Sequence, residues 1–196
     1  MPPGRRVQDW FELGRDTLMI ELITTKRTDE RLLSLMKIHY SKPKGFVGRN
    51  ICYAILYDNN YYGHIIGGSS VKHLTGRDNY FNINKQNIVN NIFYNINKID
   101  DKYPERNFTT KVLQKFIKTI TVDWELKYGN KVIGFETLVE LPRKGELYLK
   151  DKWVHVGTTK GFTCKREGGK GTDSWSGKRV WDTKNLKPKI VLCKKI

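Results

Sequence analysis

The chain has 196 residues, with 36 lysines and arginines against 20 aspartates and glutamates, and a formal net charge of +16 at pH 7. This length allows one domain with a sizeable core and does not require a second. The hydrophobic share of 38% and the aromatic share of 12% exclude a disordered chain. Because no run of about 20 apolar residues occurs and the first 15 residues are charged, we expect a cytoplasmic protein without a membrane partner.

The three cysteines are odd in number and far apart in the sequence. Cys52, Cys164 and Cys193 form no CxxC pair. This spacing argues against both a disulfide scaffold and a structural zinc site.

Apolar spacing predicts helices at residues 28–38, 109–128 and 145–152, with Thr28 capping the first and Gly129 ending the second. Apolar or alternating runs predict strands at residues 18–23, 51–57, 61–66, 88–94, 131–139, 153–157 and 189–193. The turn at residues 58–60 joins two of these strands into a hairpin. This order indicates an α/β (α+β) fold with one central mixed sheet flanked by helices. The eight asparagines between residues 79 and 97 are interpreted as compositional drift.

Positive charge is concentrated toward the C-terminus. Residues 164–196 contain ten lysines and arginines against three acidic residues, interleaved with glycines and tryptophans. Such a segment suits contact with phosphates and stacking on bases, so DNA is the expected partner. The expected contacts are Lys42, Lys44 and Arg49 near the mouth of the cleft, and Lys165, Arg166, Lys170, Trp175, Lys178 and Arg179 in the extension. The alternative is a charge that serves solubility alone.

Short motifs follow the predicted elements in a recognisable order. They are His39-Tyr40-Ser41 after the first helix, Gly68-Ser69 at the end of the hairpin, and Gly145, Tyr148, Trp153 and Gly157 near the short helix. This pattern resembles the GNAT fold of N-acyltransferases and, more specifically, the Mom DNA-modification proteins of phages. The resemblance implies a single GNAT-like catalytic domain at residues 18–163, between a basic arm (1–17) and a basic extension (164–196) that contains the last strand.

The resemblance also implies an activity. It points to transfer of a group derived from acetyl-CoA, or a related CoA thioester, to the exocyclic amine of adenine in DNA, which would protect phage DNA from host restriction. The resemblance also suggests iron as a cofactor, with His39 as the candidate ligand. Two alternatives stay open: a non-catalytic nucleic-acid-binding protein on a GNAT-like scaffold, and an N-acetyltransferase acting on a protein or a small amine. The oligomeric state is left open.

The same resemblance suggests catalytic roles for His39, Tyr40, Glu136, Glu140 and Tyr148. His39 is either a proton acceptor or a cap on the end of its helix. Glu136 and Glu140 lie four residues apart on a strand and are expected to share a face and reach the cleft, where desolvation would suit a carboxylate to general-base work. Tyr148 is either the acid that protonates the leaving thiolate or a packing residue.

The donor is expected at the start of the long helix. Unpaired amides there suit a pyrophosphate, and the matching residues are Arg106, Asn107, Phe108, Thr109 and Thr110. This stretch lacks the glycines of the family's loop, and the strand at 88–94 lacks the family's arginine. An ordinary helix capped by Asn107 or Thr109 is the alternative. Gly68, Ser69 and Ser70 are expected to present a backbone amide to the acyl carbonyl.

Overall fold

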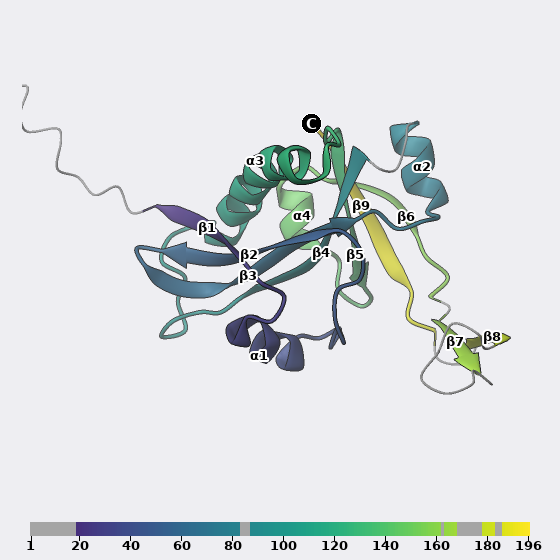
Figure 1. Ribbon diagram of the computed structural model, residues 1–196, viewed down its shortest axis with the longest axis horizontal. Helices are drawn as coiled ribbons and strands as arrows, with labels where there is room; N and C mark the ends of the chain where they lie inside the picture. Colours follow the sequence, from purple (N-terminus) through teal and green to yellow (C-terminus); the bar gives the residue numbers. More distant parts are fainter. Residues whose placement is uncertain (1–18, 83–86, 162, 168–177, 183–185) are drawn as a thin grey trace, which may run out of the picture.

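The computed structural model describes residues 19–82, 87–161, 163–167, 178–182 and 186–196 (Figure 1). Its centre is a seven-stranded mixed sheet in the order β1-β2-β3-β4-β5-β9-β6. The strands are β1 (Ile20–Thr25), β2 (Asn50–Tyr57), β3 (Asn60–Ser69), β4 (Ile88–Ile96), β5 (Gly134–Glu140), β6 (Val154–Thr158) and β9 (Lys189–Lys195). All neighbouring strands are antiparallel except β4 and β5, which run parallel. The predicted fold class is confirmed.

Helices cover both faces of the sheet (Figure 1). The long helix α3 (Phe108–Tyr128) buries Val112, Phe116 and Ile120 in the largest hydrophobic cluster, together with Ile51, Tyr53 and Ile55 of β2. The short helix α1 (Glu30–Ile38) packs Leu32, Leu35 and Met36 against Cys52 of β2 and Ile66 of β3 in a separate cluster. Because side chains alternate between faces along a strand, Cys52 and its neighbours in β2 serve opposite clusters.

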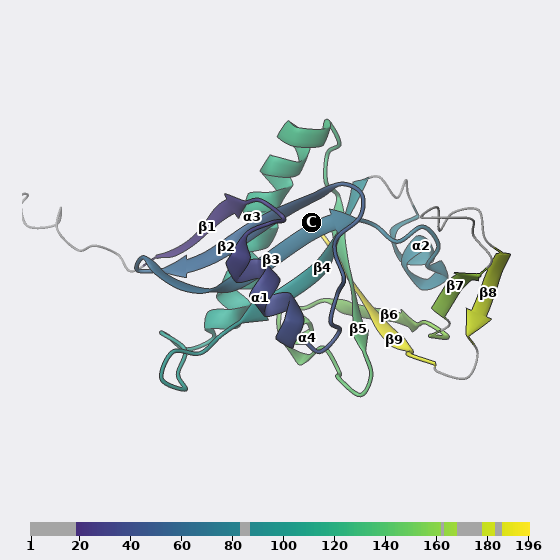
Figure 2. The same ribbon diagram turned by 60° about the horizontal axis from the view of Figure 1, so that its bottom comes forward.

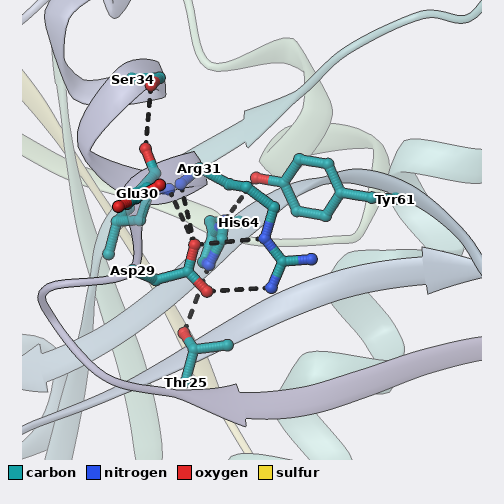
Figure 3. Close-up of polar contacts among 8 residues, drawn as sticks. Thr25, Asp29, Glu30, Arg31, Ser34, Tyr61 and His64 are labelled. Carbon is teal, nitrogen blue, oxygen red and sulfur yellow. Dashed lines mark hydrogen bonds and ion pairs between the residues drawn. The ribbon is translucent and has the colours of Figure 1, made fainter.

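Helix α1 begins one residue later than expected. Asp29, not Thr28, is its N-cap, and the Asp29 carboxylate accepts hydrogen bonds from the backbone amides of Arg31 and Leu32 at 2.9 and 3.4 Å. The Arg31 guanidinium pairs with the same carboxylate and holds the pKa of Asp29 below its usual range (Figure 3). A carboxylate at the positive end of the helix dipole is the more stabilising of the two candidate caps.

The predicted hairpin is confirmed, with a tighter turn. Asp58 and Asn59 both have positive φ, at 50° and 58°, while Asn60 already pairs with Tyr57. Two central residues with positive φ form the turn that matches the twist of a hairpin, and Asn and Asp tolerate this conformation best.

Three elements were not expected from the sequence. Helix α2 (Thr75–Phe81) follows β3, and strands β7 (Thr163–Glu167) and β8 (Lys178–Asp182) form a two-stranded antiparallel sheet of their own. This hairpin is an insertion between β6 and β9, and it stands beyond the ends of these strands in both views (Figures 1 and 2). Strand β9 then returns to the main sheet and lies between β5 and β6. Within the described residues, no helix is long and apolar enough to cross a membrane.

Candidate functional site

The site originates where the two parallel strands separate. Strands β4 and β5 are in register only at Ile88–Gly134, Val89–Phe135 and Asn90–Glu136. Both strands continue beyond this point, β4 to Ile96 and β5 to Glu140. A cavity of about 580 Å³, here called the first cavity, lies where they diverge. Its walls come from residues 39–41, 91–94, 137–140 and 142–148, with Lys189.

Asn91 anchors the point of separation. Its side-chain amide donates to the carbonyls of Ile66 and Phe93, at 3.1 and 3.2 Å. Its Oδ1 accepts a 2.6 Å hydrogen bond from the Tyr148 hydroxyl, and its backbone carbonyl accepts one from Thr137 Oγ1 at 3.0 Å. Asn91 and Thr137 are buried, so this network rigidly holds one wall of the cavity. Asn91 is one of the asparagines interpreted above as compositional drift; the signal for its role is a polar residue within an apolar strand.

Tyr148 is brought to the cavity by α4 (Glu146–Lys150), which begins after Gly145. Gly145 has a φ of +67°, and a Cβ there would lie 2.5 Å from Leu192 Cδ1, so any other residue would strain the backbone and displace the Leu192 side chain. The Tyr148 ring packs against Trp153, whose indole donates to Asp151 at 3.0 Å. Burial raises the pKa of Tyr148 well above its usual value, so the phenol keeps its proton at neutral pH.

His39 ends α1 and lies in the wall of the first cavity with its ring against Tyr40 and Phe93. Nδ1 accepts from the Ser41 amide at 3.3 Å and lies 2.9 Å from the Ser41 hydroxyl, which places the ring hydrogen of a neutral imidazole on Nε2. Burial lowers the pKa of His39, so the ring is neutral. The nitrogen that could accept a proton, Nδ1, is thus engaged by Ser41.

Iron has no evident ligand set in the part of the chain that the structure describes. No group of three or more His, Cys, Asp or Glu side chains there is arranged to hold a metal ion.

Tyr40 and Glu140 lie across the mouth of the first cavity. The Arg143 guanidinium carbon is 3.8 Å from the centroid of the Tyr40 ring. Burial raises the pKa of Tyr40. The half-buried Glu140 is the carboxylate at the end of β5. Arg143, which the sequence analysis did not single out, therefore belongs to the site.

Glu136 does not reach this cavity, so the expectation that both carboxylates line the cleft is wrong. Its side chain is fully buried, where one oxygen accepts the Val71 amide at 2.6 Å and the other is bound by Arg77 of α2. Arg77 also donates to the Val71 carbonyl at 2.7 Å. A carboxylate saturated in this way holds the segment before α2 and is not free to accept a substrate proton.

The start of α3 adjoins the first cavity through Tyr94, whose hydroxyl donates to the Thr109 carbonyl at 2.6 Å. Asn107 is the N-cap residue with φ 59°, and within the described chain no side chain caps this helix. Phe108 is buried against Tyr57 and Tyr62, while Arg106 is exposed. The expected side-chain cap from Asn107 or Thr109 is therefore absent, and Asn107 takes the left-handed conformation that a glycine would otherwise supply.

Gly68, Ser69 and Ser70 are not among the described residues that line the first cavity. Gly68 pairs with Asn90 inside the sheet, and the Ser69 amide donates to the Arg49 carbonyl at 3.0 Å. The Ser69 amide is therefore committed to the protein. The register between β3 and β4 shifts between Ile66 and Gly67, where Ile92 of β4 has no partner in β3.

The expected DNA contacts are scattered over several parts of the molecule. Lys42 and Lys44 are exposed on the loop after His39. Arg49 lies elsewhere than at the cleft mouth, since it donates to Asn130 Oδ1 at 2.5 Å and stacks over Tyr128 near the end of α3. The backbones of four others lie in the β7–β8 hairpin: Lys165, Arg166, Lys178 and Arg179. Lys170 and Trp175 lie outside the described residues.

No protein-family model matches the chain, and no curated protein sequence matches it. Several solved structures share its architecture. A Bacillus subtilis acetyltransferase solved with CoA has a TM-score of 0.50 and 12% identity, covering 91% of this chain and 99% of its own. An aminoglycoside acetyltransferase solved with coenzyme A and kanamycin has a TM-score of 0.51 and 11% identity, covering 90% and 95%. The aminoglycoside 6′-N-acetyltransferase of Enterococcus faecium has a TM-score of 0.50 and 10% identity, covering 91% and 97%. The chain has the fold of the GNAT acetyltransferases.

Proposed function

We propose that the protein is an N-acyltransferase that moves an acyl group from a CoA thioester to an amine. The observation that carries this proposal is the first cavity itself: it opens where parallel strands β4 and β5 separate, and it has Tyr148 in its wall. The likeness to acetyltransferases solved with coenzyme A supports the same reading of the fold.

The residues present fit a CoA thioester. Beyond Asn90, β4 is no longer paired with β5, so an extended donor arm with amide groups has strand edges to pair with. At the start of α3, amides without a side-chain cap and the positive end of the helix dipole suit a pyrophosphate, with Arg106 exposed beside them. When bound, the thioester supplies the activated acyl group.

Two side chains of the first cavity suit the proton transfers. We assign the acceptance of the amine proton to Glu140, because His39 Nδ1 already accepts from the Ser41 amide and Glu136 is paired with Arg77. We assign the donation of a proton to the departing sulfur to Tyr148, which burial keeps protonated. In the structure this proton is directed at Asn91 Oδ1, so the hydroxyl must rotate toward the sulfur during the reaction.

The acceptor belongs to one of two classes. A small amine is favoured by the aminoglycoside acetyltransferases that share the fold. An adenine amine in DNA, which the motifs resembling Mom proteins imply, is favoured by the net charge of +16. Duplex DNA would have to present that base unstacked.

The test combines binding and turnover. Acetyl-CoA should raise the melting temperature, because a ligand that binds only the folded state stabilises it. Free thiol released from acetyl-CoA should then be measured with kanamycin, a lysine-containing peptide and adenine-containing single-stranded DNA as acceptors. Glu140→Gln should retain the thermal shift and lose turnover. The absence of both a shift and thiol release at millimolar acetyl-CoA would contradict the proposal.

A further inference from the structure

A second cavity of about 490 Å³ adjoins the first. The two share Leu138, Glu140 and Lys189 in their walls. The remaining lining of the second cavity comes from the segment before α2, from the segment after β6, and from Lys187. Glu140 therefore lies at the border of the two cavities and faces a molecule bound in either.

The second cavity gathers lysines from both ends of the insertion. Lys160 follows β6, where the chain leaves the main sheet, and Lys187 and Lys189 lie where it returns. Backbone hydrogen bonds fix these two ends together: the Lys187 amide donates to the Gly161 carbonyl at 3.0 Å, and the Lys189 amide donates to Thr159 Oγ1 at 3.0 Å. The three lysines are thus held around one cavity by the base of the insertion.

Charge in this cavity is divided between its two ends. Glu140 is the one acidic residue among the described residues of its lining, and it lies at the junction with the first cavity. Lys160 and Lys187 line the second cavity and not the first, and both are exposed. A cationic amine is therefore attracted to the junction, while an anionic group is attracted beyond it.

The insertion between β6 and β9, whose two ends line the second cavity, is positively charged like the lysines of that cavity. Residues 160–189 contain nine lysines and arginines against three acidic residues. In the β7–β8 hairpin, Arg166 stands opposite Arg179 and Lys165 opposite Val180. The second cavity thus lies at the base of a segment that is basic in sequence.

We propose that the second cavity is a phosphate subsite, which holds a phosphate of the acceptor while the amine of the same molecule lies beside Glu140. This inference rests on the proposed acyltransferase function and defines its substrate class as a phosphate-bearing amine. Lysines act as compact point charges that suit phosphate, and a neutral or polycationic amine gains nothing from them. The phosphate comes either from a small mononucleotide-like acceptor or from a nucleic acid strand.

The test measures binding without any acyl donor. The probe is a fluorescein-labelled single-stranded oligonucleotide that contains adenine, titrated by anisotropy at several salt concentrations, with AMP and adenosine as competitors. We compare the Lys160→Ala/Lys187→Ala variant with Lys115→Ala/Lys118→Ala, which removes the same charge from the exposed side of α3. Because each lost phosphate contact on a single strand lowers the slope of log K against log salt by about 0.7, and the subsite holds one phosphate, the slope of the first variant should be smaller by about 0.7.

We expect the cavity variant to bind the oligonucleotide about tenfold more weakly at low salt, and the control to change less than twofold. Competition by AMP but not adenosine shows that one phosphate suffices; binding of the oligonucleotide without competition by AMP shows that a strand is needed. Equal binding by both variants, or equal competition by AMP and adenosine, overturns the subsite. Failure of acetyl-CoA to bind a protein that passes this test would overturn the acyltransferase proposal alone.

Discussion

The guanidinium of Arg143 lies over the ring of Tyr40, with Cζ 3.8 Å from the ring centroid. This contact joins the segment after α1 to the segment after β5, two parts of the chain about a hundred residues apart, across the mouth of the first cavity. A cation–π contact between side chains thus connects the two segments at the mouth of the first cavity.

Loss of that contact should destabilise the protein slightly. Arg143→Ala and Tyr40→Ala should each lower the free energy of unfolding by about 0.5–1 kcal/mol, the usual range for a partly exposed cation–π pair. Tyr40→Phe keeps the aromatic face and should remain closer to the wild type. Chemical denaturation of the three variants checks this order, and equal losses in Tyr40→Phe and Tyr40→Ala would assign the effect to the hydroxyl.

Tyr148→Phe should separate chemistry from folding. Removal of the proton donor is expected to reduce kcat by about 10²–10⁴, the range for general acid–base groups. The change also leaves Asn91 Oδ1 without its partner and should cost about 1–3 kcal/mol of stability, because the amide is buried. Thiol release and urea unfolding measure the two effects. Normal turnover in a destabilised variant would restrict Tyr148 to a structural role.

The ion pair between Glu136 and Arg77 should be sensitive to removal of either partner. Both side chains are fully buried, so Arg77→Met leaves the Glu136 carboxylate without its cation and should cost about 3–5 kcal/mol. Glu136→Gln should cost less, because Arg77 keeps its ion pair with Asp78 at 2.7 Å. Lys111→Ala, which breaks the exposed pair with Glu105, provides the control and should cost less than about 1 kcal/mol. Similar melting temperatures for the two kinds of variant would contradict the structure of the pair.

His64 should make the protein less stable in mild acid. It is fully buried in β3, with the Tyr61 hydroxyl 2.6 Å from Nδ1 and the Thr25 hydroxyl 3.3 Å from Nε2, and burial lowers its pKa to about 4 (Figure 3). In the unfolded chain the His64 imidazole takes up a proton near pH 6.5, and in the folded chain it does so only near pH 4. The contribution of His64 is therefore complete above about pH 6.5 and falls by up to about 3 kcal/mol as the pH drops to about 4.

The matched variant for this measurement is His64→Gln. Its free energy of unfolding should vary less than that of the wild type between about pH 6.5 and 4. Asp29, whose pKa is held low by Arg31, stays ionised over most of this window, and His39 contributes equally to both proteins. The difference between the two pH profiles thus reports on His64, and parallel profiles would exclude a neutral buried ring.

Elements with strong local signals could be predicted from the sequence. Helix α3 carries Val112, Phe116 and Ile120 four residues apart and ends at Gly129, where a residue with φ 69° is required. The β2–β3 hairpin follows from two strands around Asp58-Asn59. These features depend on neighbours in the sequence, which is why periodicity and turn chemistry suffice to find them.

Elements stabilised by distant partners could not be predicted in this way. Helix α2 has no apolar period, and its position is set by Arg77 reaching Glu136, 59 residues away. The role of Asn91 depends on Tyr148 and Thr137, which meet it only after the sheet has formed. The resemblance suggested Tyr148 and Glu140 for the same site, but the contact of His39 Nδ1 with Ser41 appears only in the structure.

The place of β9 between β5 and β6 has a consequence for the order of folding. Strand β5 has β4 as a partner over only three residue pairs, and β6 pairs with no strand other than β9 among the described elements. During synthesis, the backbone hydrogen bonds that join β5 and β6 to the sheet therefore cannot be completed until residues 189–195 have been made. The wall of the first cavity that contains Lys189 is completed by the same event. A ribosome-bound chain that lacks β9 would expose two sheet edges, and binding of the donor should begin only after the last strand has been inserted.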